Sequence, residues 1–331
     1  MFEYYLPKEL IAQYPLKERE KARLMVLNRE SGEIKEGIFS EIRDLLKTGD
    51  TLVLNNSRVI PARLRGTKKT GGKMEIFLLR KIEPRRWEVL LRGNIKQGQE
   101  SKIAKGDQSI YVKIIKMTEK GSYIAEFDTD NDIEIFSFGE VPLPPYIKRP
   151  PEKQDESFYQ TVYAKKNGSV AAPTAGLHFT VNILEELKNK GVNVVYITLH
   201  IGWASFKILK EKDKPGEEYI EITEETSNII NKTKESGNRV IAVGTSVVRA
   251  LESSVINGKV HSMSGYTDLF IEPGFKFKVI EALITNFHLP ASTHLYLVCA
   301  FAGTELIEKA YKIAIEKKYR FYSYGDCMLI L

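Results

Sequence analysis

The chain has 331 residues, with 43% hydrophobic and 28% charged side chains and a formal net charge of +6 at pH 7, which is typical of a globular protein of about two domains. The best candidate for a membrane span, Leu295 to Gly303, is too short to cross a bilayer, and the first residues lack an export signal, so we expect a cytoplasmic protein. Cys299 and Cys327 are the only cysteines, which argues against a disulfide framework or a cysteine metal site.

The first element that bears on function is a short buried strand, Thr51 to Leu54, which is followed by Asn55, Asn56 and Arg58. These polar side chains stand at a strand end, directly before a segment of different composition. Their position predicts a cleft at a domain junction.

The next segment is strongly basic and has the pattern of an all-β domain. Between Arg58 and Lys120 there are 17 Lys and Arg but only 6 Asp and Glu. Short alternating runs between turn residues predict about five or six strands, and closure into a small barrel would remove their exposed edges. Such a domain attracts phosphate groups, although a solvated lysine-rich surface explains the same charge count.

A proline-rich stretch, Val141 to Pro151, is typical of a stiff extended connector and marks a boundary. We expect residues 58–149 to form an inserted β-barrel domain that includes this connector. Residues 1–57 and 150–331 would then form one discontinuous α/β domain.

Short buried strands and amphipathic helices alternate in the C-terminal half. The predicted strands are Asn193 to Leu199, Arg239 to Val243 and Ala282 to Thr285, and Thr180 and Thr223 have the positions of helix N-caps. This alternation predicts an α/β fold: a layered domain with a mainly parallel sheet.

The run from Val170 to Thr180 places small residues and a histidine before a predicted helix. Thr174, Ala175 and Gly176 would let a ligand approach the backbone closely, with His178 at the lip of the site. A tight turn whose small residues only allow packing explains the run equally well.

Two further strand ends carry polar groups. His200 follows one strand directly, and Gly244, Thr245 and Ser246 lie between another strand and a helix. Free N–H groups at a helix start can hold a carboxylate or a phosphate. From spacing alone, an ordinary capped strand–helix junction remains the simpler interpretation of the second site.

The loop after the last predicted strand is crowded with polar and aromatic groups. Asn286 offers a donor and an acceptor, Phe287 a stacking face and His288 a proton-exchanging group, whereas we expect His294 to be a packed helix residue. No pair of histidines has metal-ligand spacing, so we expect no metal. The residues alone thus predict an α/β enzyme for a purine-like or carboxylate-bearing ligand, with a basic accessory domain.

Six segments resemble the S-adenosylmethionine:tRNA ribosyltransferase-isomerase family, in the family's order and over nearly the whole chain. They are residues 54–63 (LNNSRVIPAR), 142–147 (PLPPYI), 159–164 (YQTVYA), 172–179 (APTAGLHF), 283–290 (LITNFHLP) and 319–326 (YRFYSYGD).

The chain departs from this family after His200. The family places two histidines shortly before a glutamate, whereas this chain has Asp213 and Gly216 at those positions and Glu218 at the glutamate. Proton-transfer roles of those two histidines therefore do not carry over.

The resemblance implies that S-adenosylmethionine donates its ribosyl group to 7-aminomethyl-7-deazaguanine in tRNA. The product would be epoxyqueuosine, with adenine and methionine released, in queuosine biosynthesis. No cofactor beyond S-adenosylmethionine, no membrane and no obligatory protein partner would be needed, and we favour a monomer.

The resemblance also assigns site residues by role. The candidates are His178, His200, Glu218 and His288 for catalysis; Thr174, Ala175, Gly176, Gly244, Thr245, Ser246, Asn286 and Phe287 for S-adenosylmethionine; and Asn55, Asn56, Arg58, Arg63, Arg65, Lys68 and Lys69 for tRNA.

Two other functions stay open. A non-catalytic RNA-binding module would bind tRNA without consuming S-adenosylmethionine. A methyltransferase would consume it as a methyl donor, although no glycine-rich loop follows the first strand.

Overall fold

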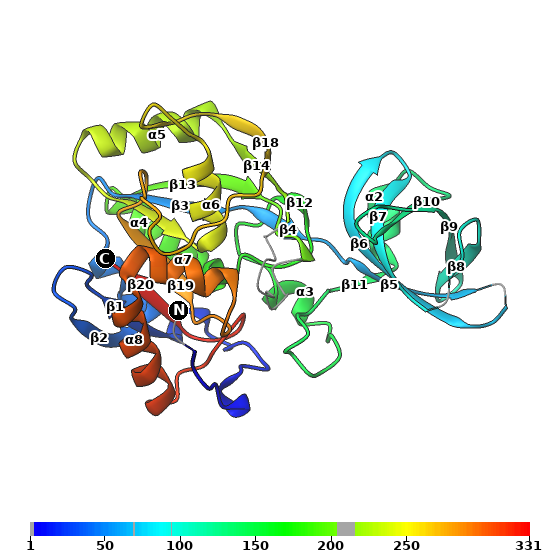
Figure 1. The fold of residues 1–331 in the computed structure, drawn as a ribbon, viewed down its shortest axis with the longest axis horizontal. Helices are drawn as coiled ribbons and strands as arrows, with labels where there is room; N and C mark the ends of the chain where they lie inside the picture. Colours follow the sequence, from blue (N-terminus) through cyan, green and yellow to red (C-terminus); the bar gives the residue numbers. More distant parts are fainter. Residues whose placement is uncertain (1–2, 69, 94, 204–215) are drawn as a thin grey trace.

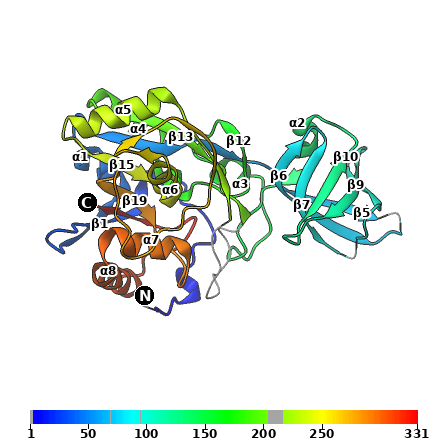
Figure 2. The same cartoon turned by 45° about the horizontal axis from the view of Figure 1, so that its top comes forward.

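The computed structural model describes residues 3–68, 70–93, 95–203 and 216–331. The chain forms a larger α/β part and a smaller β part that stands apart from it in both views (Figures 1 and 2). Both ends of the chain lie in the α/β part (Figure 1). In the described residues, no helix is both long and apolar enough to cross a membrane.

The α/β part is built on a sheet of nine strands within the described residues. In spatial order these are β18 (Met263–Thr267), β14 (Glu218–Ile222), β13 (Asn193–Leu199), β3 (Thr51–Asn55), β15 (Val240–Val243), β19 (Ala282–Asn286), β20 (Cys327–Ile330), β1 (Arg23–Leu27) and β2 (Ile34–Ile38).

This sheet is mixed, so the expectation of a mainly parallel sheet is not confirmed. The central strands β13, β3, β15 and β19 run parallel to one another. The pairs β18–β14, β14–β13, β19–β20 and β1–β2 are antiparallel, whereas β20 and β1 are parallel. The parallel centre therefore aligns the carboxyl ends of four strands along one edge, where α/β proteins place their ligands.

Helices cover both faces of this sheet because its central strands are apolar on both sides. In β3, Val53 belongs to one core cluster and Leu52 and Leu54 belong to the other, as the alternation of side chains along a strand requires. The helices of this part are α1 (Ile42–Leu45), α3 (Asp155–Phe158), α4 (Val181–Asn189), α5 (Glu224–Glu235), α6 (Thr245–Ser253), α7 (Thr293–Ala302) and α8 (Thr304–Glu316).

The predicted caps are confirmed. The hydroxyl of Thr180 accepts a hydrogen bond from the Ile183 N–H at 3.2 Å, and Thr223 caps α5 in the same way. Ser292 caps α7. These caps satisfy N–H groups that a helix start leaves without partners.

The predicted barrel is present. Six strands follow one another in the order β5, β6, β7, β10, β9, β8, and β8 pairs back with β5 to close the barrel, while the short β11 pairs with the first residues of β5. The bounds are β5 (Arg63–Lys68), β6 (Lys73–Glu83), β7 (Arg86–Arg92), β8 (Glu100–Lys105), β9 (Gln108–Met117), β10 (Tyr123–Phe127), α2 (Asp132–Ser137) and β11 (Gly139–Glu140).

Short elements complete the chain. Beside the sheet, β4 pairs with β12, and β16 with β17. Their bounds are β4 (Ser57–Val59), β12 (Lys166–Ser169), β16 (Val255–Ile256) and β17 (Lys259–Val260). Short 3-10 helices span Lys8–Leu10, Arg19–Lys21, Phe39–Glu41 and Thr174–His178.

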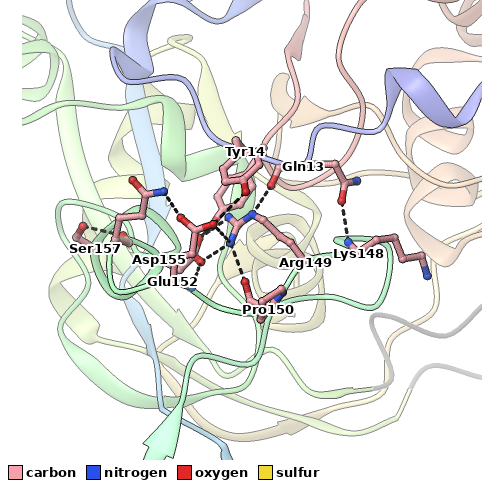
Figure 3. Close-up of polar contacts among 10 residues, drawn as sticks. Gln13, Tyr14, Lys148, Arg149, Pro150, Glu152, Asp155 and Ser157 are labelled. Atoms are coloured by element: carbon pink, nitrogen blue, oxygen red, sulfur yellow. Dashed lines mark hydrogen bonds and ion pairs between the residues drawn. The ribbon is translucent and has the colours of Figure 1, made fainter.

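The connector after the barrel is held by a buried ion pair. Arg149 donates two hydrogen bonds to the carboxylate of Asp155, at 2.6 and 2.7 Å, and a third to the backbone oxygen of Gln13 at 3.0 Å (Figure 3). Asp155 is fully buried and also accepts from the Tyr324 hydroxyl at 3.0 Å. The connector is thereby fastened to both terminal segments of the α/β part.

Candidate active site

A cavity of about 330 Å³ lies at the carboxyl ends of β15 and β19. Three loops that the sequence singled out meet there: the run before α4, the loop after β15 and the loop after β19. Of the residues expected to bind S-adenosylmethionine, those that line this cavity are Thr174, Ala175, Gly244, Thr245, Ser246, Asn286 and Phe287.

Gly176 does not line this cavity, contrary to expectation. A Cβ atom at this position would come within 2.0 Å of the Tyr163 hydroxyl. The glycine at this position thus makes room for Tyr163 and not for a ligand.

Gly244 shapes the start of α6. Its φ of 92° is in the region that favours glycine, and its N–H bonds the Ile284 carbonyl of β19 at 2.8 Å. Gly244 is the N-cap of α6, and no side chain caps this helix. The first turn of α6 therefore presents backbone N–H groups beside the cavity.

Asn286 lines this cavity and has an unused acceptor. Its Nδ2 lies 3.2 Å from the Tyr322 carbonyl and 3.4 Å from the Asp326 carbonyl, and both of these oxygens can only accept hydrogen bonds. The amide nitrogen must face them, which leaves Oδ1 on the other side. Within the described residues, this buried oxygen has no hydrogen-bond partner.

Phe287 has a different role from the one expected. Its ring is fully buried, with Tyr311, Tyr319 and Phe321 at centroid distances of 5.4, 5.5 and 5.1 Å. It anchors the loop rather than offering an open stacking face. The aromatic residues that sequence reasoning missed in the cavity wall are Tyr146, Tyr159, Phe270 and Tyr322.

His178 lies behind the cavity rather than at its lip, so its expected place is wrong. Its Nε2 is 3.2 Å from Asn286 Nδ2, its ring is 5.2 Å from that of Phe39, and it borders a separate cavity of about 30 Å³. Burial, with the nearby charges of Arg320 and Arg19, lowers the pKa of His178 to about 3. At neutral pH it is therefore an uncharged acceptor for the Asn286 amide.

His200 is also outside the wall of the larger cavity. Its Nδ1 is 2.7 Å from the Ser57 hydroxyl, its ring stacks on Tyr219 at 5.4 Å, and a Cβ atom on Gly168 would come within 2.6 Å of its Nε2. Burial lowers the pKa of His200 to about 4. The imidazole thus sits at the junction of β4, β12 and β13.

Glu218 lines the cavity and forms an ion pair with Arg249, a residue that sequence reasoning missed. Glu218 Oε1 accepts the Gly202 N–H at 2.8 Å, and Oε2 accepts from Arg249 Nη1. The side chains are only 6% and 13% exposed, which shields the pair from solvent. The available signal was the position of Arg249 one helical turn after Thr245 and Ser246.

Two histidines line the cavity, not one. His288 was expected there, but His294 was expected to be packed in its helix; the two rings stack at 5.3 Å, and His288 Nε2 is 2.8 Å from the Thr285 hydroxyl. Burial lowers the pKa of His294 to about 4, with Arg249 contributing, and lowers that of His288 well below its usual value. Both rings are therefore neutral at pH 7.

The residues expected to contact tRNA divide into buried and exposed ones. Asn55 is fully buried and donates to the Leu199 carbonyl at 2.9 Å, so its predicted contact with tRNA is wrong. Asn56 is partly buried and accepts from the Thr198 hydroxyl at 2.7 Å. Both amides join neighbouring strands of the sheet.

The basic candidates lie on β4 and β5. Arg58 is exposed and donates to the Ala164 carbonyl at 2.9 Å; Arg63 pairs with Glu75 at 3.8 Å, and Arg65 with Glu140 at 3.1 Å.

Three other positions complete the comparison with the sequence. Lys68 is the last residue of β5 and is partly buried, whereas Lys69 and Asp213 lie outside the described residues. Gly216 borders the larger cavity. Within the part of the chain that the structure describes, no group of His, Cys, Asp or Glu side chains could hold a metal ion.

Known proteins resemble this chain over its whole length. The model of a family described as queuosine biosynthesis protein matches residues 1–330. The chain is 50% identical to an S-adenosylmethionine:tRNA ribosyltransferase-isomerase from Sulfurihydrogenibium sp. and 49% identical to one from Halothermothrix orenii, in each case over 100% of this chain and 98% of the relative.

A solved structure is similar as well. The crystal structure of an S-adenosylmethionine tRNA ribosyltransferase from Thermotoga maritima is 38% identical, covers 100% of this chain and 99% of its own, and has a TM-score of 0.59.

Proposed function

The chain belongs to the queuosine biosynthesis protein family and is an S-adenosylmethionine:tRNA ribosyltransferase-isomerase, and we propose that the cavity between α6 and the loop after β19 is its active site. The enzyme moves the ribosyl group of S-adenosylmethionine onto 7-aminomethyl-7-deazaguanine in tRNA. Epoxyqueuosine is formed, and adenine and methionine are released.

One observation supports this location above the others. The wall of a single cavity combines an uncapped helix start, a cation, a buried acceptor and two neutral histidines. Its volume, about 330 Å³, is in the range of small-molecule sites. The α-carboxylate of the donor has the helix start and the nearby cation there, and the adenine has the Asn286 amide.

The reaction needs two proton transfers, for which the cavity offers neutral bases. The positive sulfonium makes the C5′ hydrogens of the donor acidic, so that a base can remove one, and adenine leaves more readily when an acid protonates it. We assign both transfers to the stacked rings of His288 and His294, which line the cavity: a neutral ring accepts the C5′ proton, and the imidazolium so formed is the acid that protonates adenine. Glu218 remains a further candidate, whereas His178 would position Asn286.

The tRNA would approach from the side of the barrel. Exposed Arg58 lies in β4, directly before the barrel, and the barrel carries most of the excess positive charge. We propose that residues 58–149 act as the RNA-binding domain and residues 1–57 and 150–331 as the catalytic domain. The modified nucleotide would be splayed out to reach the cavity.

We propose that the enzyme is a cytoplasmic monomer and needs no cofactor beyond S-adenosylmethionine as substrate. The test is incubation of the chain with labelled S-adenosylmethionine and precursor-bearing tRNA. Free adenine is the expected product. S-adenosylhomocysteine would indicate a methyltransferase instead, and binding without any product would indicate an RNA-binding module.

A further inference from the structure

Arg249 stands out among the charged groups of the cavity. Of the described residues that line it, Arg249 is the only lysine or arginine and Glu218 the only acid. Arg249 lies on α6, one turn after Thr245 and Ser246, so all three face the same side of the helix. Arg249 thus adds a positive charge to the side of the cavity where the N–H groups of the α6 start lie.

The guanidinium of Arg249 is held by two hydrogen bonds, but one of its nitrogen atoms makes none within the described residues. Its Nε donates to the Leu269 carbonyl at 2.8 Å, and its Nη1 donates to Glu218. Its Nη2 is buried and has no hydrogen-bond partner within the described residues. An N–H group buried without an acceptor is costly, so a ligand that supplies an acceptor at this point gains free energy.

We propose that Arg249 binds the α-carboxylate of S-adenosylmethionine through Nη2, together with the first turn of α6. This inference rests on the proposed function and assigns one end of the donor. A carboxylate has two oxygen atoms, so it can accept hydrogen bonds from a guanidinium and from the free N–H groups of a helix start. Glu218 is the positioning residue that holds the guanidinium.

The assignment also orients the rest of the donor. Val243, the last residue of β15, is opposite Ile284 in β19. The loops that follow these two strands are therefore neighbours at one edge of the sheet. With the carboxylate at Arg249, the adenine extends toward the Oδ1 acceptor of Asn286. The two leaving fragments, methionine and adenine, are then held at opposite ends, and the ribosyl group lies between them.

The experiment measures carboxylate recognition directly. Calorimetric dissociation constants are compared for S-adenosylmethionine and for its decarboxylated form, which keeps the sulfonium and the adenosyl group. The unmodified enzyme should prefer the carboxylated ligand by about tenfold or more. Arg249→Gln should bind S-adenosylmethionine more weakly by a similar factor, bind the decarboxylated ligand nearly as before and lose the preference.

Two controls separate this role from a structural one. Arg239→Gln breaks another shielded pair, with Asp50 at 2.5 Å before the start of β15, and should keep the preference. The double variant Glu218→Gln/Arg249→Gln removes both charges of this pair together and should lose the preference even if Arg249→Gln alone fails to fold.

Each contrary outcome has a distinct meaning. Arg249→Gln weakening both ligands equally, or keeping the preference, would overturn the assignment of Arg249. An unmodified enzyme that binds both ligands equally while still releasing adenine would do the same and leave the proposed function intact. Failure to bind S-adenosylmethionine or to release adenine at all would instead contradict the proposed function.

Discussion

The Nδ2 atom of Asn286 lies 3.2 Å from Nε2 of His178, so a residue of the cavity wall is held from behind by a buried, neutral histidine. The two residues come from different loops, before α4 and after β19. Their contact links the two loops and directs the other end of the Asn286 amide away from His178. His178 is therefore placed to orient a binding group.

Replacing His178 distinguishes positioning from proton transfer. His178→Ala should lower kcat/KM for adenine release by about tenfold or more, because Asn286 loses an acceptor that fixes its amide. His178→Gln keeps an acceptor oxygen and should recover much of the rate. tRNA binding should stay unchanged in both variants, as a filter-binding assay would show. Equal inactivity of the two variants would favour direct proton transfer by His178.

The free energy of unfolding should decrease as the pH falls, and part of this decrease should come from His178. The pKa of His178 is about 3 in the folded chain, below its usual 6.5, so the unfolded chain binds the proton more readily. The contribution of His178 to the free energy of unfolding is complete above about pH 6.5. It decreases toward pH 3 by about 1.4 kcal/mol per pH unit. The free energy of unfolding, measured with urea between pH 4 and 7, should change less steeply with pH for His178→Gln than for the unmodified chain. Identical pH slopes would contradict this.

The connector depends on the Arg149–Asp155 ion pair. Arg149→Met removes the two shortest hydrogen bonds of the fully buried Asp155 and should destabilise the chain by about 3–5 kcal/mol. The matched control is Lys148→Met at the exposed neighbouring position, which should cost less than about 0.5 kcal/mol. Chemical unfolding measures both. A loss of similar size in the two variants would show that the pair does not fasten the connector.

The pH dependence of the Arg149 variant provides a second check. Burial alone would raise the pKa of Asp155, but hydrogen bonds from Arg149, the Glu152 backbone and Tyr324 lower it below its usual 3.8. The folded chain thus favours the carboxylate, and this contribution is present above about pH 4 and lost as the pH falls below it. The difference between Arg149→Met and the unmodified chain should therefore narrow in strong acid.

Exposed Arg58 should contribute more to tRNA binding than Arg63. Arg58→Ala should weaken binding and reduce the slope of log K against log salt by about one phosphate contact. Arg63→Ala should have a smaller effect, because this side chain is 23% exposed and faces Glu75. Lys259→Ala, at an exposed position that pairs with Glu235 outside the barrel, should change nothing. Equal salt slopes for the Arg58 and Lys259 variants would place the RNA elsewhere.

Local sequence patterns were sufficient for the elements that carry the site. The caps at Thr180 and Thr223 and the glycine turn at Gly244 depend on residues within one or two turns, and each occurs where the pattern predicted it. The strand order could not be found in this way. β20 lies between β19 and β1, so it joins the two ends of the chain through pairings that no local spacing encodes.

The same limit explains the misassigned site residues. Asn55 is a polar residue at a strand end, as a binding residue would be, but its amide is taken by Leu199, far along the chain. Arg249 is a single charge in an amphipathic helix, and its importance depends on Glu218, 31 positions earlier. His294 enters the cavity because α7 turns one of its faces toward the loop after β19. Such roles follow from tertiary contacts alone.

The most direct test of the active-site assignment is a crystal structure of the enzyme with S-adenosylmethionine bound. The donor should occupy the cavity of about 330 Å³, with its carboxylate at Arg249 and the start of α6 and its adenine near Asn286. Electron density for the donor in the small cavity beside His178, or at the junction around His200, would contradict the account.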